Sequence, residues 1–167
     1  MKKLILCAIC AICGFTTASA QKFGHVNTQE IMQAMPEFAA ARTDIEKLTQ
    51  QYEADLKLMQ DELQKKGEAF EKEAATLPAN IKDRREKELN ELYQRIQQTY
   101  QDNQQALAKA QQEKLQAITT KVLDAIKAVG QEGGYVYVMD MGAGIPYIST
   151  TLSTDVTVQV KAKLGLK

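Results

Sequence analysis

The sequence has 167 residues, with 21 basic and 21 acidic side chains, one histidine and three cysteines. This balance of charge argues against a nucleic-acid partner, which would call for a basic surface. A zinc site is also disfavoured, because His25 is the only histidine and no cysteine follows Cys13.

The first twenty residues have the pattern of a secretory signal peptide. Lys2 and Lys3 precede an apolar stretch from Leu4 to Phe15, and Ala18-Ser19-Ala20 is a small-residue cleavage site. We therefore expect export and a mature chain that begins at Gln21. Loss of Lys2 and Lys3 would leave 19 basic against 21 acidic side chains. The apolar stretch is too short for a permanent anchor, so we expect no integral membrane segment after cleavage.

The region from residue 36 to residue 129 is predicted to form a long helical hairpin. Apolar side chains recur there every three or four residues, which is typical of helices that bury one face. Leu77-Pro78-Ala79-Asn80 interrupts the pattern, because Pro78 disfavours helix at the preceding residue and Asn80 can cap a new helix. We therefore expect two antiparallel helices, 36–77 and 80–129, with the tip near 77–80.

One apolar stripe on each helix is expected to form the seam of this coiled-coil arm. The seam is placed on Ile45, Leu48, Leu56, Leu63, Leu89, Ile96 and Leu107. Outside the stripes, Gln, Lys and Glu predominate, and nine of the 23 residues from 94 to 116 are Gln. A solvated surface is the ordinary interpretation of this face. The alternative is an adaptable lining against which another polypeptide lies.

Both chain ends carry short strand signals. Phe23 to Val26 predicts one strand. After Gly130 has capped the long helix, Tyr135 to Met139 predicts a second strand, buried on both faces. A third strand is expected at Ile145 to Ile148, at a sheet edge because Pro146 has no N–H to donate.

Thr154 or Asp155 is then expected to cap a closing helix that runs through Leu164. Together these elements predict a small body from residues 21–35 and 130–167. The predicted fold class is therefore α+β and mostly α. A long antiparallel helical hairpin projects from a small β-stranded oligomerisation body formed by both chain ends.

Such a body is too small to be stable alone without disulfides or a metal. Self-association would supply the missing core, and soluble homo-oligomers usually close into rings. The number of subunits does not follow from the pattern. We place the oligomer core on Val26, Tyr135, Val136, Val138, Ile145 and Ile148.

Lys22 to Ile31, followed by Met35-Pro36-Glu37, resembles the opening of the Skp (OmpH-like) family of periplasmic chaperones. Tyr135 to Asp140 and Thr154 to Thr157 are similar to the C-terminal pattern of that family. The resemblance extends over residues 21–167. It implies a periplasmic homotrimer in which the ends of three chains form a central body and three helical arms surround a cavity.

The resemblance also implies an ATP-independent holdase without cofactor or catalytic residue. Such a chaperone binds unfolded outer-membrane β-barrel proteins between its arms, prevents their aggregation and passes them on for outer-membrane insertion. Avidity from many weak contacts would replace a fixed pocket. The candidates for client contact are Met59, Phe70, Tyr93 and Tyr100.

Near the tip of the hairpin lies a basic cluster of Lys82, Arg84, Arg85 and Lys87. Weak contact with phosphate groups at the membrane surface is one interpretation of this cluster. A solvated, salt-bridged tip is the other, because acidic residues are interspersed among the cations. Members of the family are often basic, whereas this chain is close to neutral, which predicts weak long-range steering.

An exported coiled-coil spacer or assembly subunit, which bridges envelope proteins, is the alternative function. A binder of lipid surfaces is a third hypothesis, disfavoured because the helices lack a broad apolar face rimmed with cations. An enzyme is not expected. His25 lies in a strand signal, Gly142-Ala143-Gly144 precedes strand and not a phosphate-binding helix, and the carboxylates of the arm alternate with cations.

Overall fold

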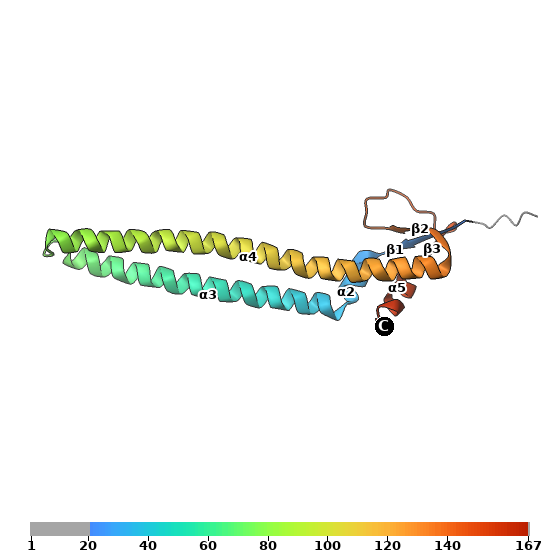
Figure 1. Cartoon of the computed structure of the whole chain (residues 1–167), viewed down its shortest axis with the longest axis horizontal. Coiled ribbons are helices and arrows are strands. Elements are labelled where there is room, and N and C mark those ends of the chain that lie inside the picture. The colour runs from blue at the N-terminus through green and yellow to red at the C-terminus, as the bar shows by residue number, and fades with distance from the viewer. Residues whose placement is uncertain (1–20, 167) are drawn as a thin grey trace, which may run out of the picture. The chain divides into compact units, whose positions relative to one another are not determined.

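The structure is a computed structural model that describes residues 21–166, so the predicted signal peptide lies outside the described residues. The elements follow in the order β1 (Lys22–Val26), α2 (Thr28–Ala34), α3 (Pro36–Glu73), α4 (Ala79–Gly133), β2 (Tyr135–Asp140), β3 (Ser153–Asp155) and α5 (Thr157–Lys163) (Figure 1). The chain forms two compact units. The terminal unit combines residues 21–28 with 125–165, and the hairpin unit spans residues 29–124. The predicted boundaries of the arm, at 36 and 129, stay a prediction.

Helices α3 and α4 lie side by side and antiparallel in the hairpin unit, which confirms the predicted fold class (Figure 1). With 38 residues, α3 is about 57 Å long at about 1.5 Å per residue. Pro36 occupies its first turn, where a missing N–H costs nothing. Met35 is extended, as a residue before proline prefers, so the sequence fixes where α3 begins.

The hairpin tip differs from the prediction by a few residues. Helix α3 ends at Glu73 instead of Leu77, and a turn follows. The carbonyl oxygen of Glu73 accepts hydrogen bonds from the backbone and hydroxyl of Thr76, at 2.9 Å each, and from the amide of Leu77. The Thr76 hydroxyl thus completes the C-terminal turn, which favours an early end of the helix.

At its other end, α4 continues beyond Gly130, so the prediction that Gly130 caps it was wrong. The helix ends at Gly133, and Gly134 has a φ of +65°. This left-handed conformation is one that glycine adopts without steric cost. Gly130 instead lies inside the helix, where a Cβ would make an ordinary contact of 3.6 Å with a methyl of Val138.

The seam of the hairpin is only partly covered. Helix α3 has no fully buried residue, and its stripe from Phe38 to Phe70 is half-buried. On α4, the buried side chains of the hairpin unit are Leu92, Ile96, Ile118 and Val122. Each helix has a single partner, so neither stripe is enclosed on both sides. Tyr100 and Leu115 of α4 are exposed, because the two helices bury only a narrow strip between them.

The terminal unit contains a three-stranded parallel sheet in the order β2-β1-β3. Strands β1 and β2 form where Phe23–Val26 and Tyr135–Met139 predicted them, but β2 lies at an edge. The predicted strand at Ile145–Ile148 was wrong: residues 141–152 form a loop, and β3 is Ser153–Asp155. Gly144, with a φ of +74°, and Pro146 disfavour a regular strand in that loop.

Helix α5 begins at Thr157, and its N-cap residue is Val156, one residue after the predicted cap at Asp155. The carboxylate of Asp155 accepts a hydrogen bond of 2.8 Å from the amide of Thr157. The amide of Val156 donates to the carbonyl of His25, so the chain passes from β3 into α5 while still bonded to β1. The helix ends at Lys163, one residue before the predicted Leu164. Val26, Val156 and Val160 are fully buried and form the core here.

Candidate functional site: exposed apolar surfaces

One face of the sheet carries a cluster of exposed apolar side chains. Phe23, Tyr137 and Met139 point to the same side, because paired residues in parallel strands share a face. The rings of Phe23 and Tyr137 stack with centroids 6.2 Å apart and planes 9° apart. From the loop, Tyr147 and Leu152 border a hollow of about 210 Å³ above these rings and are 79% and 78% exposed.

We call this cluster the sheet patch, defined by Phe23, Tyr137, Met139, Tyr147 and Leu152. Soluble monomers rarely expose contiguous apolar surface of this kind, which usually marks an interaction site. Strand β2 adds a second feature, since in residues 21–166 it pairs only with β1. An edge strand presents unpaired backbone groups that can bond to another chain.

The predicted oligomer-core residues lie in different environments. Val26 is 1% exposed and packs inside the terminal unit, whereas Val136 on β2 is 47% exposed. Tyr135 and Val138 are half-buried, with both side chains against Gly24. Ile145 and Ile148 are half-buried in the loop, and Ile148 borders the hollow. Their role in an oligomer stays a prediction.

The sequence prediction missed Phe23, Tyr137, Met139, Tyr147 and Leu152. The alternation along β2 contained the signal for two of them, because Tyr137 and Met139 fall on one face of a strand. The assumption that β2 was buried on both faces concealed it. Tyr147 and Leu152 could not be placed, because their exposure depends on the course of an irregular loop.

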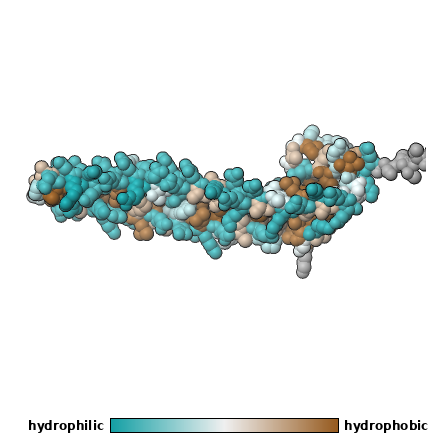
Figure 2. Space-filling view, viewed as in Figure 1, coloured by the Kyte–Doolittle hydropathy of each residue, from teal (hydrophilic) through white to brown (hydrophobic). Residues whose placement is uncertain are grey.

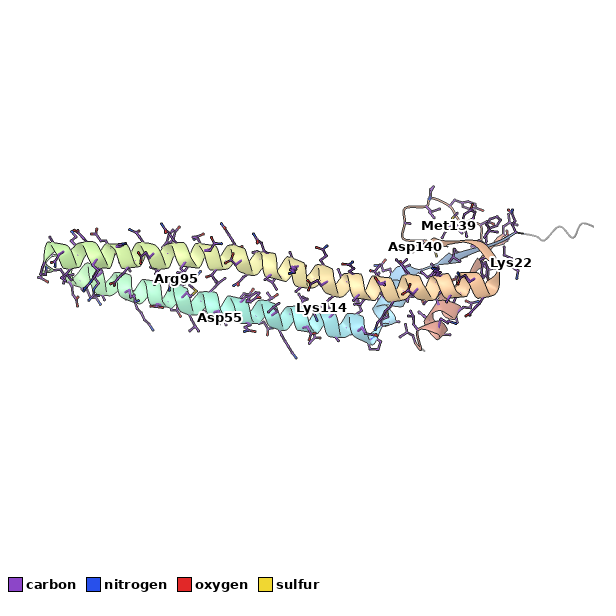
Figure 3. All side chains as sticks on the ribbon, in the orientation of Figure 1. Lys22, Asp55, Arg95, Lys114, Met139 and Asp140 are labelled. Carbon is purple, nitrogen blue, oxygen red and sulfur yellow. The ribbon has the colours of Figure 1, made fainter. Side chains whose placement is uncertain are left out.

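Asp140 fixes the end of β2. Its carboxylate accepts hydrogen bonds from the Thr28 hydroxyl at 2.7 Å, the Thr28 amide at 3.4 Å and the Gly142 amide at 3.0 Å. Figure 3 labels Asp140 at this position. The start of α2 and the start of the loop are thereby tied to the same strand end.

His25 has a structural environment. Its side chain is buried on β1, with Nδ1 2.9 Å from the Ser153 hydroxyl on β3. The pKa of Asp155 lies below its usual value, chiefly because Thr157 donates hydrogen bonds to its carboxylate. Residues 21–166 contain no group of three His, Cys, Asp or Glu side chains that could hold a metal ion.

Two ion pairs join the helices of the hairpin unit. Lys114 Nζ lies 2.7 Å from Asp44 Oδ2, and Lys121 Nζ lies 2.9 Å from Glu37 Oε1. Both carboxylates have a lowered pKa, because each accepts a hydrogen bond from its lysine. Figure 3 labels Lys114, whose pairing orients its side chain across the hairpin.

Beside Lys114 the helices border an apolar groove of about 370 Å³. Phe38, Ala41 and Ile45 of α3 line one wall, and Leu115 of α4 lines the other, with Arg42, Gln111 and Lys114 at its margins. A second hollow follows α4 and shares Gln111 and Leu115 with the first before it reaches Leu123. In Figure 2 the surface over α3 and α4 is mostly hydrophilic, with separate hydrophobic patches.

The predicted client-contact residues are divided between seam and surface. Met59 and Phe70 are half-buried in the stripe of α3, whereas Tyr93 and Tyr100 of α4 are exposed. The predicted basic cluster lies at the start of α4, where all but the half-buried Arg85 are exposed. Within it, Arg84 approaches Glu88 at 3.7 Å and Lys87 approaches Glu91 at 3.8 Å. None of the helices in residues 21–166 is long and apolar enough to cross a bilayer.

The sequence is similar to a known protein family, in agreement with this architecture. Residues 22–164 match the family described as outer membrane protein (OmpH-like). The chain belongs to the OmpH-like family. This confirms the resemblance inferred from the sequence motifs at its two ends.

Among its relatives, the chaperone protein Skp of Yersinia enterocolitica is 27% identical over 165 residues, which are 96% of this chain and 100% of that protein. The chaperone protein Skp of Photorhabdus laumondii is 28% identical over the same length, with the same coverage. A crystal structure from Caulobacter crescentus, described as an OmpH-like outer membrane chaperone, aligns with a TM-score of 0.75. The alignment covers 90% of this chain and 88% of that one at 16% identity, so it supports the OmpH-like fold alone.

Proposed function

We propose that this OmpH-like protein is a periplasmic chaperone that holds unfolded outer-membrane β-barrel proteins, keeps them from aggregating and passes them on for membrane insertion. The observation that carries the proposal is the long hairpin whose apolar seam stays half open along α3. The proposal is also supported by the relatives described above, which are named chaperone protein Skp.

The proposed mechanism needs neither ATP nor a cofactor. An unfolded β-barrel protein exposes apolar side chains at alternate positions, and these can contact partly open apolar surface on the helices. Each contact is small, so binding depends on many simultaneous contacts and remains reversible. The Gln-rich face of α4 would accept hydrogen bonds from the client backbone without fixing its conformation.

Homotrimerisation is part of the proposal. The sheet patch and the unpaired edge of β2 supply apolar surface and backbone groups for a neighbouring subunit. A trimer would also multiply the number of hairpins that hold one client. Periplasmic location is supported by the signal-peptide pattern of residues 1–20 and by the Skp relatives.

The first test is the mass of the purified protein by light scattering, alone and with a urea-unfolded β-barrel protein diluted into the sample. We expect a trimer that forms a soluble complex of one trimer with one client, and slower aggregation of the client. A trimer that leaves the client to aggregate would instead favour the spacer function. A monomer would contradict the proposed assembly.

A further inference from the structure

The groove of the hairpin unit and the hollow along α4 form one continuous surface. Both are bordered by Gln111 and Leu115, so the groove beside Phe38 leads directly into the strip toward Leu123. We call this surface the arm groove, defined by Phe38, Ala41, Arg42, Ile45, Leu115 and Leu123. All of it lies within residues 29–124, in one compact unit.

The arm groove exposes large apolar side chains among uncharged polar ones. Leu115 is 47% exposed and Leu123 is 56% exposed. The intervening positions that border the strip are mainly Gln and Thr, which can hydrogen-bond to a polypeptide backbone. The surface therefore offers apolar contacts and backbone partners side by side.

The charges at the groove are unbalanced. Lys114 is neutralised by Asp44 across the hairpin. Arg42 is exposed at the margin of the groove and forms no ion pair with any of residues 21–166. The groove thus carries one unpaired guanidinium, whose planar fork suits a carboxylate. Charge complementarity favours an occupant that brings a carboxylate next to an apolar side chain.

We propose that the arm groove is a binding site for extended segments of unfolded client in which an aromatic or aliphatic side chain stands next to Asp or Glu. The apolar side chain lies between Phe38, Ile45 and Leu115, and the adjacent carboxylate pairs with Arg42. This inference rests on the proposed chaperone function and assigns a site and a sequence preference to it.

A second copy of the chain is a less suitable occupant. Stable protein interfaces bury roughly 800 Å² on each partner, which is more than a groove bordered by a few side chains of two helices supplies. An apolar side chain with a neighbouring carboxylate, in contrast, needs a small hollow and one cation. This is the combination that the groove offers.

The first experiment compares client affinity between two sets of variants. Leu115→Gln combined with Leu123→Gln removes the apolar side chains of the strip. Leu58→Gln is the matched control, because Leu58 is 68% exposed on α3 but borders neither hollow. We expect about a tenfold rise in the Kd for a fluorescent, urea-unfolded β-barrel protein in the double variant, and about a twofold change or less in the control.

The results separate the two proposals. If the wild-type protein fails to bind the client, the proposed function is wrong and the inference falls with it. If the wild type binds and the double variant binds equally well, the arm groove is not the site, but the chaperone function stands. Helix content and mass of each variant are measured in parallel, so that loss of folding is recognised.

The second experiment tests the role of Arg42. Two short fluorescent peptides are compared that differ only in Asp or Asn beside a single Phe. We expect the wild type to bind the Asp peptide several-fold more tightly. Arg42→Gln should abolish this preference and Arg42→Lys should keep part of it. Equal binding of both peptides by the wild type would overturn the proposed pairing.

A third measurement asks whether another copy covers the groove. In a chain with Cys7, Cys10 and Cys13 replaced by Ser, Leu115→Cys introduces the single thiol. A maleimide should label it rapidly in the free protein and slowly once the unfolded client has bound. Slow labelling in the free protein would show that the groove is already covered by the oligomer, which would contradict the proposal.

Discussion

Lys114 Nζ on α4 lies 2.7 Å from Asp44 Oδ2 on α3, and this contact joins residues that are 70 positions apart. The pair formed by Lys121 and Glu37 repeats the arrangement two helical turns farther along α4. Both pairs lie where the seam offers only half-buried apolar side chains on α3. They therefore add cross-helix contacts to a hairpin that has no fully enclosed stripe.

These ion pairs predict how the hairpin responds to acid. The pKa of Asp44 is lowered from 3.8 and that of Glu37 from 4.5, mainly by hydrogen bonds from Lys114 and Lys121. A carboxyl group whose pKa is lower in the folded state contributes stability above its unfolded pKa and loses it as pH falls through the folded value. We expect the urea concentration at the unfolding midpoint, measured by circular dichroism, to decrease once the pH is lowered below about 4.5.

The matched test is a double-mutant cycle of Asp44→Asn and Lys114→Gln. Each single variant should lose less stability in acid than the wild type does. At neutral pH, the free energy of unfolding of the double variant should be little lower than that of either single variant. Both groups are exposed, so the effect should shrink in high salt. An unchanged acid profile in Asp44→Asn would contradict a role of this pair.

Gly67 is a position where a substitution is expected to stabilise helix α3. It occupies a half-buried position in the stripe of α3, and a Cβ built there would have no neighbour within 4 Å. Gly67→Ala should therefore fit without a clash and raise the free energy of unfolding by about 0.5 to 1 kcal/mol, because alanine favours helix. Thermal unfolding followed by circular dichroism measures it.

Gly133→Ala is the control for that substitution, since it also changes a helical glycine of the chain. There the added methyl would collide with the ring of Tyr135, so this variant should be destabilised. If both substitutions moved the unfolding temperature in the same direction, the space beside each glycine would not be what decides the outcome.

The hairpin was predictable because a long helix repeats one apolar signal many times. Pro36 marked where α3 begins, and Pro78 marked the break before α4, although α3 already ends at Glu73. The predicted sheet was less accurate, because strand order depends on long-range pairing that short segments do not encode. Ser153–Asp155 lacks the apolar run of a typical strand, yet it pairs with β1 through its backbone.

The exposed site residues were harder to predict for a related reason. Leu115 fits the apolar period of its helix, yet it is 47% exposed because the single partner helix leaves it outside the seam. Whether such a residue is core or surface depends on how much of the stripe its partner covers. Arg42 gave no signal at all, because its unpaired state is defined by its neighbours in space.

The hydrogen bonds between Thr28 and Asp140 are expected to stabilise the end of β2 in the terminal unit. Asp140 accepts three hydrogen bonds at the end of β2, of which the shortest comes from the Thr28 hydroxyl at 2.7 Å. Thr28→Val keeps the shape of the side chain and removes this donor, which should destabilise the protein by about 1 to 2 kcal/mol. Asp140→Ala should cost more, because two backbone amides also lose their acceptor.

Amide hydrogen exchange of residues 135–140 measures this effect locally. Thr43→Val is the control, because its hydroxyl bonds only to the carbonyl of Ala39 within α3. Protection of β2 should decrease in the Thr28 and Asp140 variants and stay unchanged in Thr43→Val. Unchanged protection in Asp140→Ala would mean that other contacts hold the strand end.

The difference between Val136 and Val26 predicts how the oligomer can be separated from the fold. Val136 is about half exposed on the edge strand β2, so the carboxylate of Val136→Glu can reach water when the chain is alone. In an oligomer built on this strand, the same charge would be buried without a partner. We therefore expect Val136→Glu to give a folded monomer, with helix content preserved and the mass reduced in light scattering.

Val26 is fully buried within its own chain, so Val26→Glu should unfold the terminal unit whatever the oligomeric state. If Val136→Glu kept the mass of the wild type, the edge of β2 would not belong to the subunit interface, and Tyr137→Glu on the sheet patch would be the next variant to measure.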